Sequence, residues 1–121
     1  MRVFVDWGTP NLRAWLVDDT GRVKRRFASE HGLLVASDIG FEKTFEQVLK
    51  GLDADPATPA LLFGMVGSQK GWLEVPYVTT PADAGSIARS ARAIPGRPNT
   101  RIFGGVCHDF DGQSPEVMRG E

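Results

Sequence analysis

Three short runs with the composition of β-strands occupy the first 29 residues, and tight turns separate them. Residues 2–6 are an apolar run that ends on Asp6, and along residues 12–18 the side chains alternate between two faces. A strong turn signal follows at residues 18–21, and residues 23–29 continue as a third strand. Adjacent strands joined by tight turns predict an antiparallel meander, so we expect this part of the chain to form a sheet.

The hydrophobic pattern changes its period after the meander. Phe41, Phe45 and Leu49 recur at helical spacing, which predicts an amphipathic helix over residues 39–52. Asp38 directly precedes this helix and is a suitable N-cap, because its side chain can accept a hydrogen bond from the first turn. We therefore expect this helix to pack on the sheet through its aromatic face.

Three further elements are predicted along the rest of the chain: a buried strand over 60–66, a weaker helix over 86–93 and a last apolar strand over 101–107. The predicted order is therefore β-β-β-α-β-α-β. A hairpin unit followed by helix-crossover strands is typical of an α/β domain, here with a five-stranded mixed sheet and flanking helices.

Composition narrows the class of protein. A chain of 121 residues fits one domain. Its 14 basic and 15 acidic residues are nearly balanced, so we expect neither nucleic acid nor an anionic membrane as a partner. Cys107 is the single cysteine, which excludes an internal disulfide and favours a reducing, cytoplasmic compartment. We see no signal peptide and no apolar run long enough to cross a membrane.

The first segment that could carry chemistry is residues 6–13. Asp6 stands at the end of the first strand, where a carboxylate could position Mg²⁺, and Gly8 allows a sharp turn and close approach of a ligand. Thr9, Asn11 and Arg13 add donors suited to phosphate. The alternative interpretation is an ordinary β-hairpin, because Asp-x-Gly is common in turns.

The second segment begins inside the predicted fourth strand and continues as a long loop. Gly67 and Ser68 lie where a strand end could approach a ligand closely, and Trp72 could wall a small polar substrate. The alternative is a glycine-rich loop with an aromatic residue anchored in the core, and from the residues alone that alternative is favoured.

The third segment follows the last predicted strand. His108, Asp109 and Asp111 could be interpreted as metal ligands, but no spacing typical of a zinc site occurs, and Asp111-Gly112 favours a turn. Asp109, Asp111 and Glu121 are candidates for a general base, because they follow the strand where a cleft should open.

Together the three segments resemble the 2-dehydro-3-deoxygalactonokinase family, also called 2-keto-3-deoxygalactonate kinases. The matching stretches, in the family's order, are DWGTPNLRAW (6–15), GMVGSQKGW (64–72), PYVTTPA (76–82) and VMRGE (117–121). Asp-x-Gly alone is weak, since many actin-like ATPases carry it, but the combination is specific. The resemblance covers essentially the whole chain. The element order predicted for this chain fits the ribonuclease H-like fold of actin, sugar kinases and chaperone ATPases.

The resemblance implies phosphorylation of 2-dehydro-3-deoxy-D-galactonate by ATP and Mg²⁺ in galactonate breakdown. By motif match, Asp6, Gly8 and Thr9 belong to the first phosphate-binding loop, where Asp6 is the metal-binding and catalytic carboxylate. Asn11 and Arg13 lie beside the phosphates or the acceptor carboxylate. The motifs place Gly67, Ser68 and Trp72 beside the sugar acid. Of the three general-base candidates only Glu121 matches a family stretch, VMRGE, and we favour it over Asp109, while Asp111 suits a plain turn. Pro10 departs from the family, which usually has Ser or Thr there, and so does Gly104, where proline is usual.

The chain stops at Glu121, where the family continues into a second lobe with the second phosphate loop and the adenosine pocket. The resemblance therefore implies an N-terminal lobe over residues 1–121 that is inactive alone, with the missing lobe as its partner. Two alternatives stay open: a phosphohydrolase of the exopolyphosphatase type, and a non-catalytic assembly module that forms homo-oligomers through the uncovered surface. A nuclease is disfavoured, because only Asp6 is an acidic residue clearly at a strand end.

Overall fold

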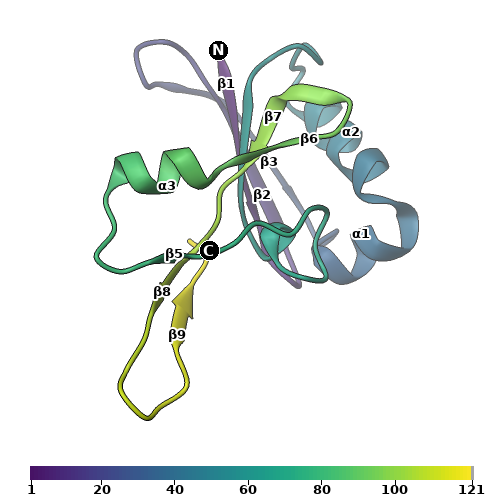
Figure 1. Ribbon diagram of the computed structural model, residues 1–121. Helices are drawn as coiled ribbons and strands as arrows, with labels where there is room; N and C mark the ends of the chain where they lie inside the picture. Colours follow the sequence, from purple (N-terminus) through teal and green to yellow (C-terminus); the bar gives the residue numbers. More distant parts are fainter. Residues whose placement is uncertain (121) are drawn as a thin grey trace.

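The computed structural model describes residues 1–120, and a mixed sheet of six strands forms its body (Figure 1). The strands are β1 (Arg2–Trp7), β2 (Leu12–Val17), β3 (Val23–Ser29), β4 (Ala60–Gly64), β6 (Arg92–Ile94) and β7 (Arg97–Ile102). Their order across the sheet is β3-β2-β1-β4-β7-β6. The antiparallel meander of the first three strands is confirmed. β4 then pairs in parallel with β1, and β7 in parallel with β4.

A second sheet of three strands accompanies the first and was not predicted. It consists of β5 (Val78–Thr79), β8 (Val106–His108) and β9 (Glu116–Met118), in the order β5-β8-β9. The single strand expected over residues 101–107 is wrong, because β7 ends at Ile102 and the chain leaves the main sheet to pair with β5. Figure 1 shows β8, β9 and the loop between them projecting from the body as an arm.

The prediction of five strands in one sheet is therefore wrong in number. The region predicted to be a helix over 86–93 contains both the helix α3 (Ala84–Ser90) and the start of β6, which pairs antiparallel with β7. Asp83 caps α3: its side chain accepts a hydrogen bond from the Ser86 amide, and this bond lowers the pKa of Asp83 below its ordinary value.

Two helices pack on one side of the main sheet (Figure 1). They are α1 (Leu33–Ile39), which was not predicted, and α2 (Phe41–Gly51), which matches the predicted helix closely. Gly40 separates them with a φ angle of 102°, a conformation that favours glycine, and it is the N-cap of α2. Asp38 is therefore not the N-cap, because it lies inside α1.

The core lies between α2 and the inner face of the sheet. Val3, Val5 and Trp7 of β1 are completely buried there, together with Phe45 and Val48 of α2. The strict alternation along β1 and β2 sends the intervening side chains to the opposite face. The predicted packing of α2 through Phe45 and Leu49 is confirmed.

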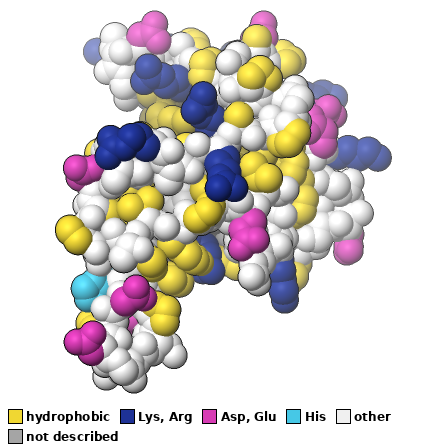
Figure 2. Space-filling model, viewed as in Figure 1, with side chains coloured by type: hydrophobic (Ala, Val, Ile, Leu, Met, Phe, Trp, Pro, Cys, Tyr) yellow, Lys and Arg dark blue, Asp and Glu magenta, His cyan; other side chains and the backbone are white. Residues whose placement is uncertain are grey.

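Charged side chains are mixed on the visible surface of the molecule. Figure 2 shows basic and acidic side chains interspersed with hydrophobic and uncharged ones on the face that it presents. Within residues 1–120, none of the helices has both the length and the apolar character needed to cross a bilayer.

Candidate functional site

Asp6 lies near the end of β1, with β2 on one side and β4 on the other. It stands opposite Arg13 in the antiparallel register of β1 and β2. Arg13 Nη2 donates a hydrogen bond to Asp6 Oδ2 at 2.5 Å, so the two side chains form an ion pair. The Asp6 residue is only 6% exposed, whereas Arg13 extends into solvent. The strand pairing thus brings together two residues that the sequence predicted for one site.

The turn over residues 8–11 is held at both ends by backbone hydrogen bonds. The Gly8 amide donates to the Asn11 carbonyl at 2.9 Å, which closes the turn. The Leu33 amide, at the start of α1, donates to the Gly8 carbonyl at 2.9 Å. A Cβ atom on Gly32 would lie 2.2 Å from the Thr9 carbonyl oxygen, so only glycine permits this close approach. The turn is therefore fixed against the first helix.

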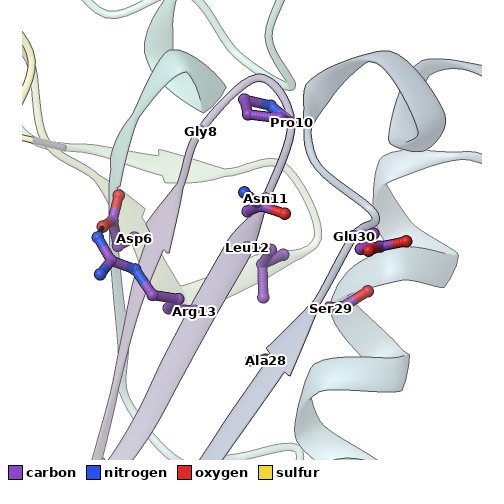
Figure 3. A pocket seen from close by; sticks show the side chains of 9 residues that line it. All are labelled: Asp6, Gly8, Pro10, Asn11, Leu12, Arg13, Ala28, Ser29 and Glu30. Carbon is purple, nitrogen blue, oxygen red and sulfur yellow. Dashed lines mark hydrogen bonds and ion pairs between the residues drawn. The ribbon is translucent and has the colours of Figure 1, made fainter.

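A groove of about 610 Å³ lies beside Asp6 and this turn (Figure 3). Its lining residues are Asp6, Gly8, Pro10, Asn11, Leu12, Arg13, Ala28, Ser29 and Glu30. Figure 3 shows Asp6 and Arg13 pointing toward one another, while Ser29 and Glu30 approach from the end of β3. The structure thus brings Asp6, Gly8, Asn11 and Arg13 to one groove, whereas Thr9 is half-buried in the turn and does not line it.

Ser29 and Glu30 are groove residues that the sequence analysis missed. They reach the groove because β3 pairs with β2, where Ser29 stands opposite Leu12. The predicted meander already placed the end of the third strand beside the start of the second. Ser29 and Glu30 could therefore have been predicted as groove residues from the meander.

A second groove, of about 480 Å³, opens beside the loop that follows β4. Its lining residues are Met65, Gly67, Ser68, Gln69, Lys70, Glu74, Val75, Pro76, Tyr77 and Arg119. Gly67 and Ser68 are therefore brought together as expected. Arg119 is a groove residue that the sequence analysis did not assign, although it belongs to the VMRGE stretch.

Trp72 does not line this groove. Its ring stacks on Phe41, with ring centroids 6.4 Å apart and an angle of 10° between the ring planes. It also contacts the rings of Trp7 and Phe45, at centroid distances of 6.1 and 5.7 Å. These contacts anchor the loop after β4 to the core, which agrees with the structural alternative considered for this residue.

The two grooves lie at the same end of the main sheet, where β1 and β4 have their carboxyl ends. β1 and β4 are parallel, and Trp7 at the end of β1 pairs with Gly64 at the end of β4. The first groove lies on the β2 side of β1, and the second follows β4. Ligand sites of open α/β sheets form outside the carboxyl ends of parallel strands, which is where both grooves lie.

Comparison with known proteins decides the family. The model of the 2-keto-3-deoxy-galactonokinase family matches residues 6–121. The chain belongs to this family. It is 36% identical over 118 residues to "Probable 2-dehydro-3-deoxygalactonokinase DgoK1" of Rhizobium meliloti (strain 1021), and 34% identical over 122 residues to 2-dehydro-3-deoxygalactonokinase of Escherichia coli (strain K12).

A solved structure supports the same family. A crystal structure from Sinorhizobium meliloti, provisionally named a 2-dehydro-3-deoxygalactonokinase, matches 99% of the chain at 35% identity and a TM-score of 0.90. This chain covers 40% of that protein, and it covers 38% and 39% of the two curated relatives. The chain thus spans about two-fifths of the length of these members of the kinase family.

The structure places the residues of the third segment, which follows β7, in separate surroundings. Asp109 and Asp111 lie exposed in the loop between β8 and β9, and neither lines the two grooves. His108 contacts Thr80 through its ring nitrogen, 2.5 Å from the hydroxyl oxygen. Among residues 1–120 no three acidic, histidine or cysteine side chains form a metal cluster. Glu121 lies outside the described residues, and its role stays a prediction.

Proposed function

We propose that this chain is the N-terminal, ribonuclease H-like lobe of a kinase that transfers a phosphoryl group from ATP to a hydroxyl of 2-dehydro-3-deoxy-D-galactonate. The observation that carries the proposal is the groove at the end of β1, where Asp6 and Arg13 meet beside the turn over residues 8–11. Membership of the 2-keto-3-deoxy-galactonokinase family supports the reaction. The meander followed by parallel strands supports the assignment of the lobe.

The residues of the groove fit a magnesium-dependent reaction. Mg²⁺ is commonly held by one or two carboxylates together with water and substrate phosphates, and Asp6 offers a carboxylate at the groove. Asp6 would hold the ion directly or through water, and the ion when bound offsets negative charge on the phosphates. Phosphoryl transfer depends mainly on positioning and charge stabilisation, so one correctly placed carboxylate matters greatly.

The remaining groove residues supply positioning. Asn11 offers a side-chain amide on the rim, and the turn brings the Gly8 backbone close to the space beside Asp6. The Arg13 guanidinium, which is largely exposed, can contact a phosphate oxygen while it keeps Asp6 oriented. Pro10 has no hydroxyl, so the turn presents fewer side-chain donors than the usual family sequence. We propose Glu121 as the general base ahead of Asp109, because Asp109 lies in the loop between β8 and β9 and lines neither groove.

The nucleotide site is proposed to be shared with a second lobe. Because relatives are more than twice as long as this chain, the part beyond the matched region is expected to carry the second phosphate loop and the adenosine pocket. Closure of two lobes excludes water from the reacting groups. We therefore expect the 121 residues alone to show no measurable kinase turnover, in contrast to a full-length kinase that contains them.

The test is the substitution Asp6→Asn in that full-length kinase, assayed with ATP, Mg²⁺ and 2-dehydro-3-deoxy-D-galactonate. Asparagine keeps the size of the side chain and removes its charge. We expect turnover to fall by roughly 10²–10³-fold, the range typical for loss of a group that stabilises charge in the transition state. The matched control is Asp19→Asn, because Asp19 is exposed and its carboxylate pairs with the N-terminal amino group, away from both grooves.

Two results would count against the proposal. Near-normal turnover of the Asp6→Asn variant would leave Asp6 as a hairpin residue. Phosphate release from ATP at the same rate with and without the sugar acid would instead support a phosphohydrolase, because hydrolysis needs no acceptor hydroxyl.

A further inference from the structure

Two residues that line the groove after β4 each have a buried polar atom without a hydrogen-bond partner among the described residues. These atoms are the Ser68 hydroxyl oxygen and Arg119 Nε. Buried polar groups nearly always have a hydrogen-bond partner in folded proteins. Two such atoms without a partner, on residues that line one groove, point to a ligand that supplies the missing hydrogen bonds. The first groove does not show this feature, which makes the second groove the distinctive one.

Arg119 is held in place before any ligand arrives. Its carbonyl oxygen accepts a hydrogen bond from the Gly64 amide at 3.1 Å, which ties it to the end of β4. Its guanidinium carbon lies 5.3 Å from the centroid of the Tyr77 ring. Stacking on an aromatic ring and a fixed backbone limit the motion of the side chain, so little freedom is lost when the planar guanidinium binds an anion.

The donors in the groove suit an oxyanion. Arg119 and Lys70 carry positive charge, Ser68 offers a hydroxyl, and Glu74 is the one acidic side chain among the lining residues. The guanidinium fork matches both carboxylates and phosphates. Pro76 and Tyr77 add apolar surface against which a short carbon chain can pack.

We propose that Arg119 and Ser68 bind the carboxylate of the acidic substrate and so select a sugar acid over a neutral sugar. This inference rests on the proposed function, because it places the acceptor's carboxylate in the second groove and its hydroxyl end toward Asp6. The first groove lies beside the end of β1 and the second follows β4, and Trp7 and Gly64 at these two strand ends are paired in the sheet. A phosphate of the nucleotide is the competing source of the same chemistry.

The direct test uses the ¹⁵N-labelled 121-residue chain and nuclear magnetic resonance. Three probes are titrated separately: 2-dehydro-3-deoxy-D-galactonate, the neutral sugar 2-deoxy-D-galactose, and ATP. We expect the sugar acid to shift the Arg119 Nε–H and Ser68 amide signals, and the neutral sugar to leave them unchanged. Shifts produced by ATP and not by the sugar acid would overturn the proposal in favour of a phosphate site.

Variants make the test specific. Arg119→Lys keeps the charge but loses the Nε–H and the planar fork, so the dissociation constant for the sugar acid should rise at least about 10-fold. Ser68→Ala should weaken binding in the same direction and serves as the second variant if Arg119→Lys disturbs folding. Arg25→Lys is the matched control, because Arg25 lies on the exposed edge strand β3 and should leave binding unchanged.

Kinetics of a full-length kinase separate this inference from the proposed function. Arg119→Lys should raise KM for the sugar acid by about the same factor as the dissociation constant, and leave KM for ATP and the response to Asp6→Asn unchanged. An active kinase whose KM and sugar-acid binding are unaffected by Arg119→Lys and Ser68→Ala would overturn the inference alone. Binding of the acid by the full-length protein without any kinase activity of that full-length protein would refute the proposed function and leave the carboxylate site standing.

Discussion

Asp6 and Trp7 are neighbours in the sequence and have opposite surroundings. Strand geometry sends their side chains to opposite faces of β1. Trp7 is completely buried among the rings of Phe41 and Trp72, whereas Asp6 meets Arg13 beside the groove. The core contact of Trp7 therefore fixes the position of the strand end, and through it the position of the carboxylate.

Phe45 belongs to the same aromatic cluster and gives a prediction at the residue scale. Its ring is completely buried, contacts Trp72, and lies 5.2 Å below the guanidinium carbon of Arg97. Phe45→Ala leaves a cavity, so we expect the free energy of unfolding to fall by about 3–5 kcal/mol. Denaturation in urea, followed by tryptophan fluorescence, measures the change.

Two further variants complete the Phe45 experiment. Phe45→Leu keeps most of the volume and should cost clearly less than alanine. Phe110→Ala is the control, because Phe110 lies on the arm and is 42% exposed. An equal loss for Phe45→Ala and Phe110→Ala would show that the aromatic cluster does not stabilise the fold.

At the scale of elements, α1 and the turn over residues 8–11 act as one unit. The hydrogen bond from the Leu33 amide to the Gly8 carbonyl joins them, and Gly32 provides the space for this approach. The helix itself buries only Leu33 and Ala36, so its contact with the turn is a substantial part of its packing. The groove beside Asp6 thus depends on a helix that contributes no side chain to it.

The prediction for this unit is the substitution Gly32→Ala. Gly32 has a φ angle of −66°, so alanine suits the backbone and the cost is purely steric. The added Cβ would lie 2.2 Å from the Thr9 carbonyl oxygen, and the turn or the helix must move. We expect a loss of about 1–3 kcal/mol in the free energy of unfolding, together with shifted amide signals of residues 8–11.

Gly85→Ala provides the comparison for Gly32→Ala. Gly85 lies in α3, and the nearest atom to an added Cβ is the end of the flexible Arg89 side chain, 3.0 Å away. Alanine also has the higher helix propensity, so this variant should be neutral or slightly stabilising. If Gly32→Ala proved as harmless as Gly85→Ala, the turn would not be held by α1.

At the scale of the whole molecule, the two sheets differ in how many of their residues are buried. The buried hydrophobic residues form one cluster centred on the main sheet and α2. By contrast, all three residues of β9 are exposed, and Met118 is 66% exposed. Strands with few buried contacts open at a lower free energy than strands in the core.

Hydrogen exchange tests this difference. We expect the amides of β1 and β4 to be the slowest to exchange in the chain, because the body must unfold to expose them. The amides of β8 and β9 should exchange through local opening at least about 10-fold faster. Measuring exchange by nuclear magnetic resonance in the intact chain gives both rates, and equal protection of β4 and β9 would mean that the arm and the body unfold together.

Local sequence patterns determined the meander, α2 and the strand β4. Alternation along residues 12–18, the turn signal at residues 18–21 and the helical spacing of Phe41, Phe45 and Leu49 each act within one element, so they can be interpreted from neighbouring residues alone. The position of Asp6 at a strand end and its approach to Arg13 follow from the same meander.

Tertiary structure alone decided the second sheet and the second groove. β5 has only two residues, and its partner β8 lies 28 residues further along the chain, so no local period indicates that they pair. Trp72 joined the core instead of the groove because the rings around it come from β1 and α2. Arg119 lines the same groove as Ser68, and its carbonyl accepts a hydrogen bond from the Gly64 amide, a contact between distant segments that only the folded chain creates.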